Sequence, residues 1–232
     1  MQGRFSSTFK MSAFNSMAVE LGLAGRFEEA ASLLSHGLFE TNEYRSPDIA
    51  HFHSSATSPV ANNNMVLHQF HLSAPQGIGQ VSPANVYAFY PVLFSVGRHT
   101  HSVSAETAET FQEFTSAIMV HNLAVLCHRA AMSNGSTHEL KRALRLYNLS
   151  ARTLRLCTDT VSAVAILLIA VANMAQIHSH FSNHAKAQGC FQCAFDMLLQ
   201  VRDETLGSEP LYHSMFAHLS LCGHVSAHSP AA

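Results

Sequence analysis

Residues 13–38 read AFNSMAVELGLAGRFEEAASLLSHGL, and the two helical faces within this stretch decide the fold. Apolar residues on the first face recur at offsets of three, four and seven positions: Phe14, Met17, Ala18 and Leu21. Gly25 interrupts this pattern. A second face of the same kind follows it: Phe27, Ala30, Ala31, Leu34 and Leu38. Because such spacing is typical of amphipathic helices, the stretch predicts an antiparallel helical hairpin over residues 11–39.

The composition of the whole chain excludes several classes of protein. Lys and Arg total 13, Asp and Glu total 15, and charged residues make up only 12% of the 232 positions. With a net charge of −2, the chain is not expected to bind nucleic acid through a broad basic surface. The five cysteines follow no disulfide spacing and no secretory signal is evident, so we expect a cytoplasmic protein.

A very apolar segment over residues 160–181 raises the question of a membrane span. Its uninterrupted apolar run, 163–172, covers ten residues, about half of the 20 or so that a bilayer requires. We therefore expect a buried helix here and no membrane partner.

The middle of the chain departs from helical spacing. Five of the seven prolines fall between residues 40 and 105, among Ser, Asn and His residues. Few helices tolerate prolines at this density, so the sequence predicts a long irregular insert over 40–105. Residues 86–96 are rich in β-branched and aromatic side chains and predict a partly extended piece, which Pro91 would confine to a sheet edge.

Helical spacing returns after the insert. Ser136 and Glu139 form a capping box, which marks a helix start. The pattern predicts two more helical hairpins over residues 106–201 and a final capping helix over 208–223. The expected fold class is all-α.

The hairpins share one arrangement of small and bulky residues. In the first and last hairpins the offsets are 12, 4 and 3: Ala18, Ala30, Leu34 and Gly37, then Ala175, Ala187, Phe191 and Ala194. The middle hairpin keeps the pattern with seven extra residues before its second helix: Ala124, Ala143 and Tyr147. This arrangement resembles the tetratricopeptide repeat (TPR) and is similar to TPR-like proteins of microalgae. It departs from the family in lacking Trp and in carrying alanine where the first helix usually has glycine.

The resemblance implies TPR-like antiparallel hairpins stacked as a short solenoid, with the first helix of each hairpin lining a concave groove. The peptide-binding residues that it implies are Asn15, His121, Asn122, His128, Arg129, Asn173, Gln176 and His180. Asn and Gln side chains can bind the main chain of a peptide as both donors and acceptors. The alternative for Asn122 and Asn173 is that they only tie neighbouring helices together.

A cluster of metal-ligand residue types lies near the end of the apolar segment: His178, His180, His184, Cys190 and Cys193. Zinc takes these ligand types, but the two cysteines fall inside an expected helix. The weaker reading is a metal site, and the stronger one is a set of core and surface side chains. No cofactor is expected.

The sequence therefore favours a non-enzymatic protein–protein interaction module that binds a peptide or helix of another protein in a concave groove. The first alternative is a self-associating structural helical protein, and a His/Cys metal-binding protein is the second. Motifs for nucleophilic catalysis, phosphate binding and zinc peptidases are missing from the sequence, so no enzyme activity is expected.

Overall fold

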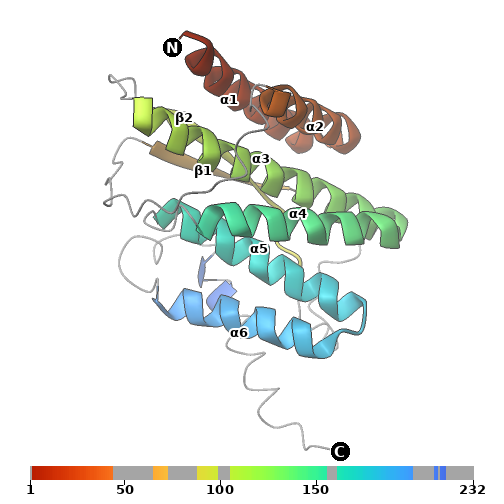
Figure 1. Cartoon of the computed structure of the whole chain (residues 1–232). Coiled ribbons are helices and arrows are strands. Elements are labelled where there is room, and N and C mark those ends of the chain that lie inside the picture. The colour runs from red at the N-terminus through yellow and green to blue at the C-terminus, as the bar shows by residue number, and fades with distance from the viewer. Residues whose placement is uncertain are drawn as a thin grey trace, which may run out of the picture.

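A computed structural model describes residues 2–43, 65–72, 88–98, 105–155, 161–200, 212–213 and 215–217. These residues are mostly helical, which confirms the predicted all-α character in its coarse form. The long helices are α1 (Gln2–Leu23), α2 (Phe27–Glu43), α3 (Ala105–Asn134), α4 (Thr137–Arg155), α5 (Val161–His180) and α6 (His184–Gln200). Each of them packs against the next in sequence, and Figure 1 shows them descending in order from α1 and α2 to α6.

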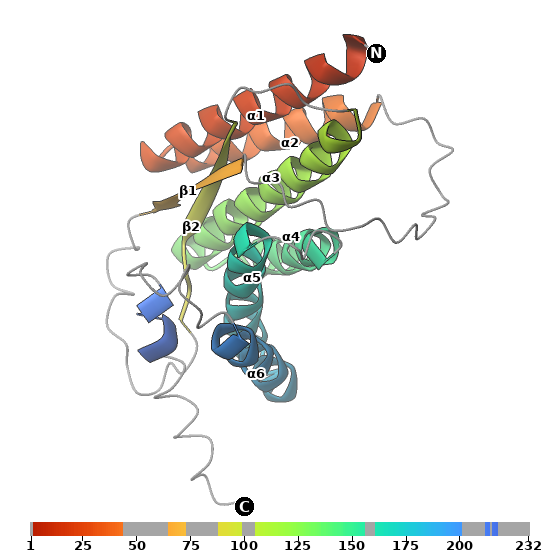
Figure 2. The same cartoon turned by 90° about the vertical axis from the view of Figure 1, so that its left-hand side faces the viewer.

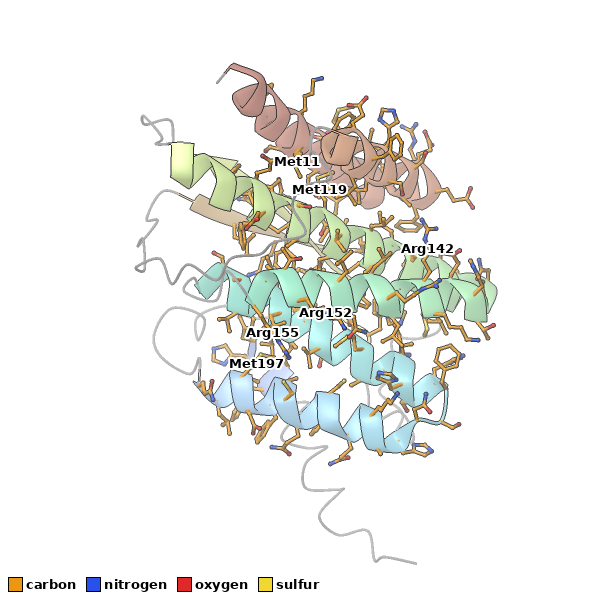
Figure 3. All side chains as sticks on the ribbon, in the orientation of Figure 1. Met11, Met119, Arg142, Arg152, Arg155 and Met197 are labelled. Carbon is orange, nitrogen blue, oxygen red and sulfur yellow. The ribbon has the colours of Figure 1, made fainter. Side chains whose placement is uncertain are left out.

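Short turns explain why consecutive helices fold back on each other. Gly25 and Gly135 have positive φ values of 77° and 70°, a conformation that costs glycine little. Met11 and Met119 are both buried, and Figure 3 shows them where the first hairpin meets α3. The predicted start of the first hairpin, residue 11, is too late because α1 begins at Gln2.

Two strands lie within the segment that the sequence predicted to be an irregular insert. Strand β1 (Met65–His71) pairs antiparallel with β2 (Val92–Arg98), and Gln69 lies opposite Phe94. The extended piece predicted near 86–96 corresponds to β2 and the residues from 88 that precede it. Strand β1 was not predicted, so the described part of the insert has one more extended piece than the sequence indicated. Residues 44–64, 73–87 and 99–104 of the insert lie outside the described residues.

Helix α5 forms the apolar centre of the second half of the chain. Its residues 162–180 are long and apolar enough to cross a membrane, but 78% of that window is buried inside the protein. The apolar side chains of α5 are therefore packed against the chain itself.

The predicted capping helix over 208–223 lies largely outside the described residues. Within it, residues 212–213 and 215–217 are helical, and Tyr212 and Met215 are buried. Tyr212 accepts a hydrogen bond from Gln69 Nε2 of β1 at 3.3 Å, while Phe216 stacks on Phe195 of α6 with ring centroids 6.4 Å apart. These contacts place the C-terminal segment against both α6 and the strand pair.

Candidate functional site

Strand β2 and the residues before it lie across the first helix of each hairpin. Figure 2 shows both strands on one side of α3, with α4 on the opposite side. Strand β2 packs against α1 and α3, and Tyr90, just before it, reaches α5. Residues 88–98 therefore occupy the place where the family resemblance put a concave groove.

The main chain of Phe94 is held by two asparagines from different helices. Its N–H donates to Asn122 Oδ1 at 2.9 Å, and its carbonyl accepts from Asn122 Nδ2 at 2.7 Å and from Asn15 Nδ2 at 2.9 Å. Asn122 Nδ2 also donates to Asn15 Oδ1 at 2.8 Å. One residue of β2 thus links α1 and α3 through buried hydrogen bonds.

Asn173 of α5 binds Tyr90 in the same way. The N–H of Tyr90 donates to Asn173 Oδ1 at 2.8 Å, and Asn173 Nδ2 donates to the Tyr90 carbonyl at 3.0 Å. The same Nδ2 donates to Tyr147 Oη of α4 at 3.1 Å. Asn122 and Asn173 each lie two positions before the small residue of their repeat, Ala124 and Ala175. Equivalent positions on two helices therefore bind the main chain of Phe94 and Tyr90, which are four residues apart.

The helices contact every second residue of the extended segment along one edge. Four alternate residues of the segment bond through their main chain to helix side chains. Tyr90 bonds to Asn173, Val92 to His121, Phe94 to both Asn122 and Asn15, and Val96 to Ser12. A period of two is that of a strand, and the opposite edge of β2 pairs with β1. The polar side chains of α1, α3 and α5 therefore take the place of a second neighbouring strand.

Two histidines on α3 border the segment and are kept neutral by burial. His121 Nε2 donates to the Val92 carbonyl at 3.3 Å, and burial lowers the pKa of His121 to about 4. His128 Nε2 donates to Gln176 Oε1 at 2.7 Å beneath the ring of Phe89, and burial lowers the pKa of His128 to about 3. Desolvation dominates both shifts because the charged imidazolium would lose its hydration.

The remaining predicted groove residues do not touch the main chain of the segment. Arg129 is only 8% exposed, and its guanidinium lies 5.4 Å from the centre of the Phe27 ring. Its Nε and Nη1 atoms find no hydrogen-bond partner among the described residues, and burial lowers the pKa of Arg129. His180 is exposed at the end of α5, edge-on to Phe181.

Seven of the eight predicted peptide-binding residues are thus buried, and four of them bind the chain's own segment: Asn15, His121, Asn122 and Asn173. Asn122 also bonds to Asn15 of α1, and Asn173 to Tyr147 of α4, so each of these asparagines joins its helix to a neighbouring one. Sequence reasoning missed Ser12 and Ser16, whose short hydroxyl side chains at i and i+4 face β2. It also missed the Tyr147 hydroxyl, although it placed Tyr147 at the bulky repeat position.

The metal-ligand candidates are not brought together. His178 is half-buried, His180 and His184 are exposed, and Cys190 and Cys193 are free, half-buried thiols. Burial raises the pKa of the Cys190 thiol, and the neighbouring Cys193 adds to this. In the part of the chain that the structure describes, no three His, Cys, Asp or Glu side chains are grouped as metal ligands.

Comparison with protein-family models, curated proteins and solved structures found no match for the chain.

Proposed function

We propose that the protein is a non-enzymatic interaction module, a TPR-like solenoid whose concave groove binds an extended segment of another protein. In this proposal, residues 88–98 are a built-in occupant that the partner segment replaces. The observation that carries the proposal is the pair of asparagine clamps. Asn122 and Asn173 each bind both main-chain groups of one residue, Phe94 and Tyr90 respectively.

Main-chain recognition favours an extended partner over a helical one. In a helix the N–H and C=O groups are bonded within the helix itself, so they cannot satisfy these asparagines. An extended chain leaves the main-chain groups along one edge free. The groove thus suits a strand-like segment of loosely specified sequence.

Side-chain burial sets the second requirement for the partner. Three consecutive side chains of the segment are fully buried: Val92, Leu93 and Phe94. Burial of each one stabilises the segment in this position by roughly 1.5–3 kcal/mol. The native segment is also tethered, which raises its effective concentration. A partner segment must therefore be comparably apolar, and it must present bulky residues on both faces of the strand.

A reversible disulfide that ties β2 to α1 tests the proposal. Ser16 Oγ of α1 lies 3.1 Å from Ser95 Oγ of β2, so Ser16→Cys with Ser95→Cys places two thiols within disulfide reach. The probe is a fluorescein-labelled peptide of residues 88–98, AFYPVLFSVGR. We expect fluorescence anisotropy to report binding to the reduced protein and none to the oxidised protein.

Two controls keep this test specific. The single Ser95→Cys variant, oxidised in the same way, should bind the peptide as the reduced form does. A peptide methylated at the nitrogen of Phe94 loses the donor to Asn122 and should bind more weakly. Equal binding by the locked and unlocked protein, or no binding by the unlocked protein, would contradict the proposed function.

A further inference from the structure

The outer helices of the first two hairpins carry opposite charges. Helix α2 has four Glu and no Lys or Arg, whereas α4 has five Lys or Arg and one Glu. In a chain with only 13 basic residues, α4 alone holds more than a third of them. This separation is not needed for folding, because both helices contact α3 through their apolar faces.

The basic residues of α4 form one exposed stripe, which we call the α4 basic face: Lys141, Arg145, Arg152 and Arg155. Figure 3 shows Arg152 and Arg155 near one end of α4 and Arg142 towards the other. Arg142 is paired with Glu139 at 3.6 Å, but none of the four stripe residues forms an ion pair within the described ranges. Exposed Asn148 and Leu149 interrupt the stripe at its middle.

Helix α2 presents the complementary pattern, which we call the α2 acidic face. Glu28 and Glu29 lie at its start and Glu40 near its end, with exposed Ser32 and His36 between them. Glu29 pairs with Arg26, and Glu40 lies 3.7 Å from His36 Nε2, so Glu28 is the glutamate of this face for which the described residues show no ion pair. Glu28 and Glu40 are 12 residues apart, and Lys141 and Arg152 are 11 apart. At about 1.5 Å per residue both separations are about 17 Å, so the charged ends of the two faces match in register.

Helices α2 and α4 border the same surface pocket. Glu28 of α2 and Arg142 of α4 line one surface pocket of about 490 Å³, together with Asn134 at the end of α3. Figure 1 shows α2 and α4 running in the same direction away from this end. A twofold axis between them, running along the helices, would therefore place the α2 of each copy against the α4 of the other, with the two helices parallel.

We propose that two copies of this chain associate through these faces, each α2 acidic face contacting the α4 basic face of the second copy. Charge complementarity favours a second copy of this chain as the partner, because α4 carries basic residues near both of its ends and α2 carries acidic residues near both of its ends. An isologous pairing satisfies both faces at once and closes the assembly at two copies. Phe39 and Leu149, 64% and 52% exposed, add apolar surface to the two faces.

The test measures mass in solution by sedimentation and light scattering. The full chain should change from 25.3 kDa to twice that mass as its concentration rises. About 0.5 M NaCl should weaken the association by roughly tenfold or more, because it screens charges beyond about 5 Å. A monomer at every concentration would overturn the proposal.

Charge reversal identifies the faces. Arg145→Glu with Arg152→Glu, and separately Glu28→Lys with Glu40→Lys, should each leave a folded monomer, checked by circular dichroism. Mixed together, the two variants should form a one-to-one dimer because both contacts become complementary again. Retention of the dimer by either variant alone would show that the copies meet elsewhere and would overturn the proposal.

A matched control separates the faces from general attraction. Lys10→Glu with Lys186→Glu makes the same change in net charge as the α4 variant but alters exposed residues of α1 and α6. This control should dimerise by itself and should form no one-to-one dimer with the α2 variant. If the α2 variant paired equally well with the α4 variant and with this control, the assignment of the faces would be contradicted.

Discussion

The two sides of α3 differ in how they treat polar residues. Towards α4, the contact is mostly apolar: α4 buries Leu140, Ala143 and Tyr147 while its charges stay in water, and one buried hydrogen bond runs from Ser150 Oγ to the Ala117 carbonyl at 2.9 Å. Towards β2, α3 buries His121, Asn122 and His128, uncharged polar groups whose partners come from distant parts of the chain. The comparison teaches that polar residues on an inner helix can indicate a bound strand as well as a surface open to solvent.

The most damaging change to the strand side should be Phe94→Ala. Phe94 is fully buried between the helices and β1, so truncation leaves a cavity and should lower the free energy of unfolding by about 4 kcal/mol. Urea unfolding followed by circular dichroism measures this. The matched control is Phe9→Ala, at a site 79% exposed, where the change should stay within about 0.5 kcal/mol. Similar losses at both sites would contradict the buried strand.

Asn122→Leu tests the hydrogen bonds without removing side-chain volume. It leaves the Phe94 N–H and Asn15 Oδ1 without these partners, so the free energy of unfolding should fall by about 3 kcal/mol. Asn148→Leu on α4 is the control, since Asn148 is exposed and, among the described residues, bonds to its own helix through the Leu144 carbonyl. A loss below about 1 kcal/mol at Asn122 would show that the clamp contributes little.

Acid should lower the stability of the side of α3 that faces β2, because of its two buried histidines. Because burial lowers the pKa of His121 to about 4 and of His128 to about 3, the unfolded chain binds protons first as the pH falls below 6.5. The free energy of unfolding should therefore be highest above about pH 7, and each of the two histidines should lower it by about 2 kcal/mol at pH 5. Urea unfolding at several pH values measures the slope, and His128→Leu should remove about half of this loss. A flat profile from pH 7 to 5 would show that these rings are not buried.

Tyr147→Phe should have the smallest effect. The Tyr147 hydroxyl accepts one of the two hydrogen bonds that Asn173 Nδ2 donates, and the other, to Tyr90, remains. The expected loss is about 1 kcal/mol in the free energy of unfolding, measured by urea titration. A loss as large as that of Asn122→Leu would mean that Tyr147, rather than Asn173, holds this end of the segment.

The helices could be predicted because their signals are local. The capping box at Ser136 marks the start of α4, where the Glu139 N–H is 3.3 Å from Ser136 Oγ, and the glycine turn at Gly25 separates α1 from α2. The pairing of β1 with β2 could not be predicted in the same way. Its register joins Met65 to Arg98, and strand β1, MVLHQFH, lacks the alternation of a half-buried strand.

Four residues named from the sequence as peptide-binding contact residues 88–98 of the same chain, and the sequence did not predict this contact: Asn15, His121, Asn122 and Asn173. Asn122 and Asn173 could be singled out because they share one repeat position on the first helices. The position of residues 88–98 against these helices depends on contacts such as Asn15 with Phe94, 79 positions apart. A single sequence holds no local signal for a contact of that range.

Amide hydrogen exchange at Phe94 and Tyr90, followed by NMR, tests the central claim most directly. Both N–H groups donate to asparagine side chains of the helices, that of Phe94 to Asn122 and that of Tyr90 to Asn173. If residues 88–98 occupy the groove, both amides should exchange far more slowly than those of an unstructured chain, and Asn122→Leu should speed exchange at Phe94 more than at Tyr90. Exchange at the unstructured rate in the wild-type protein would contradict the account.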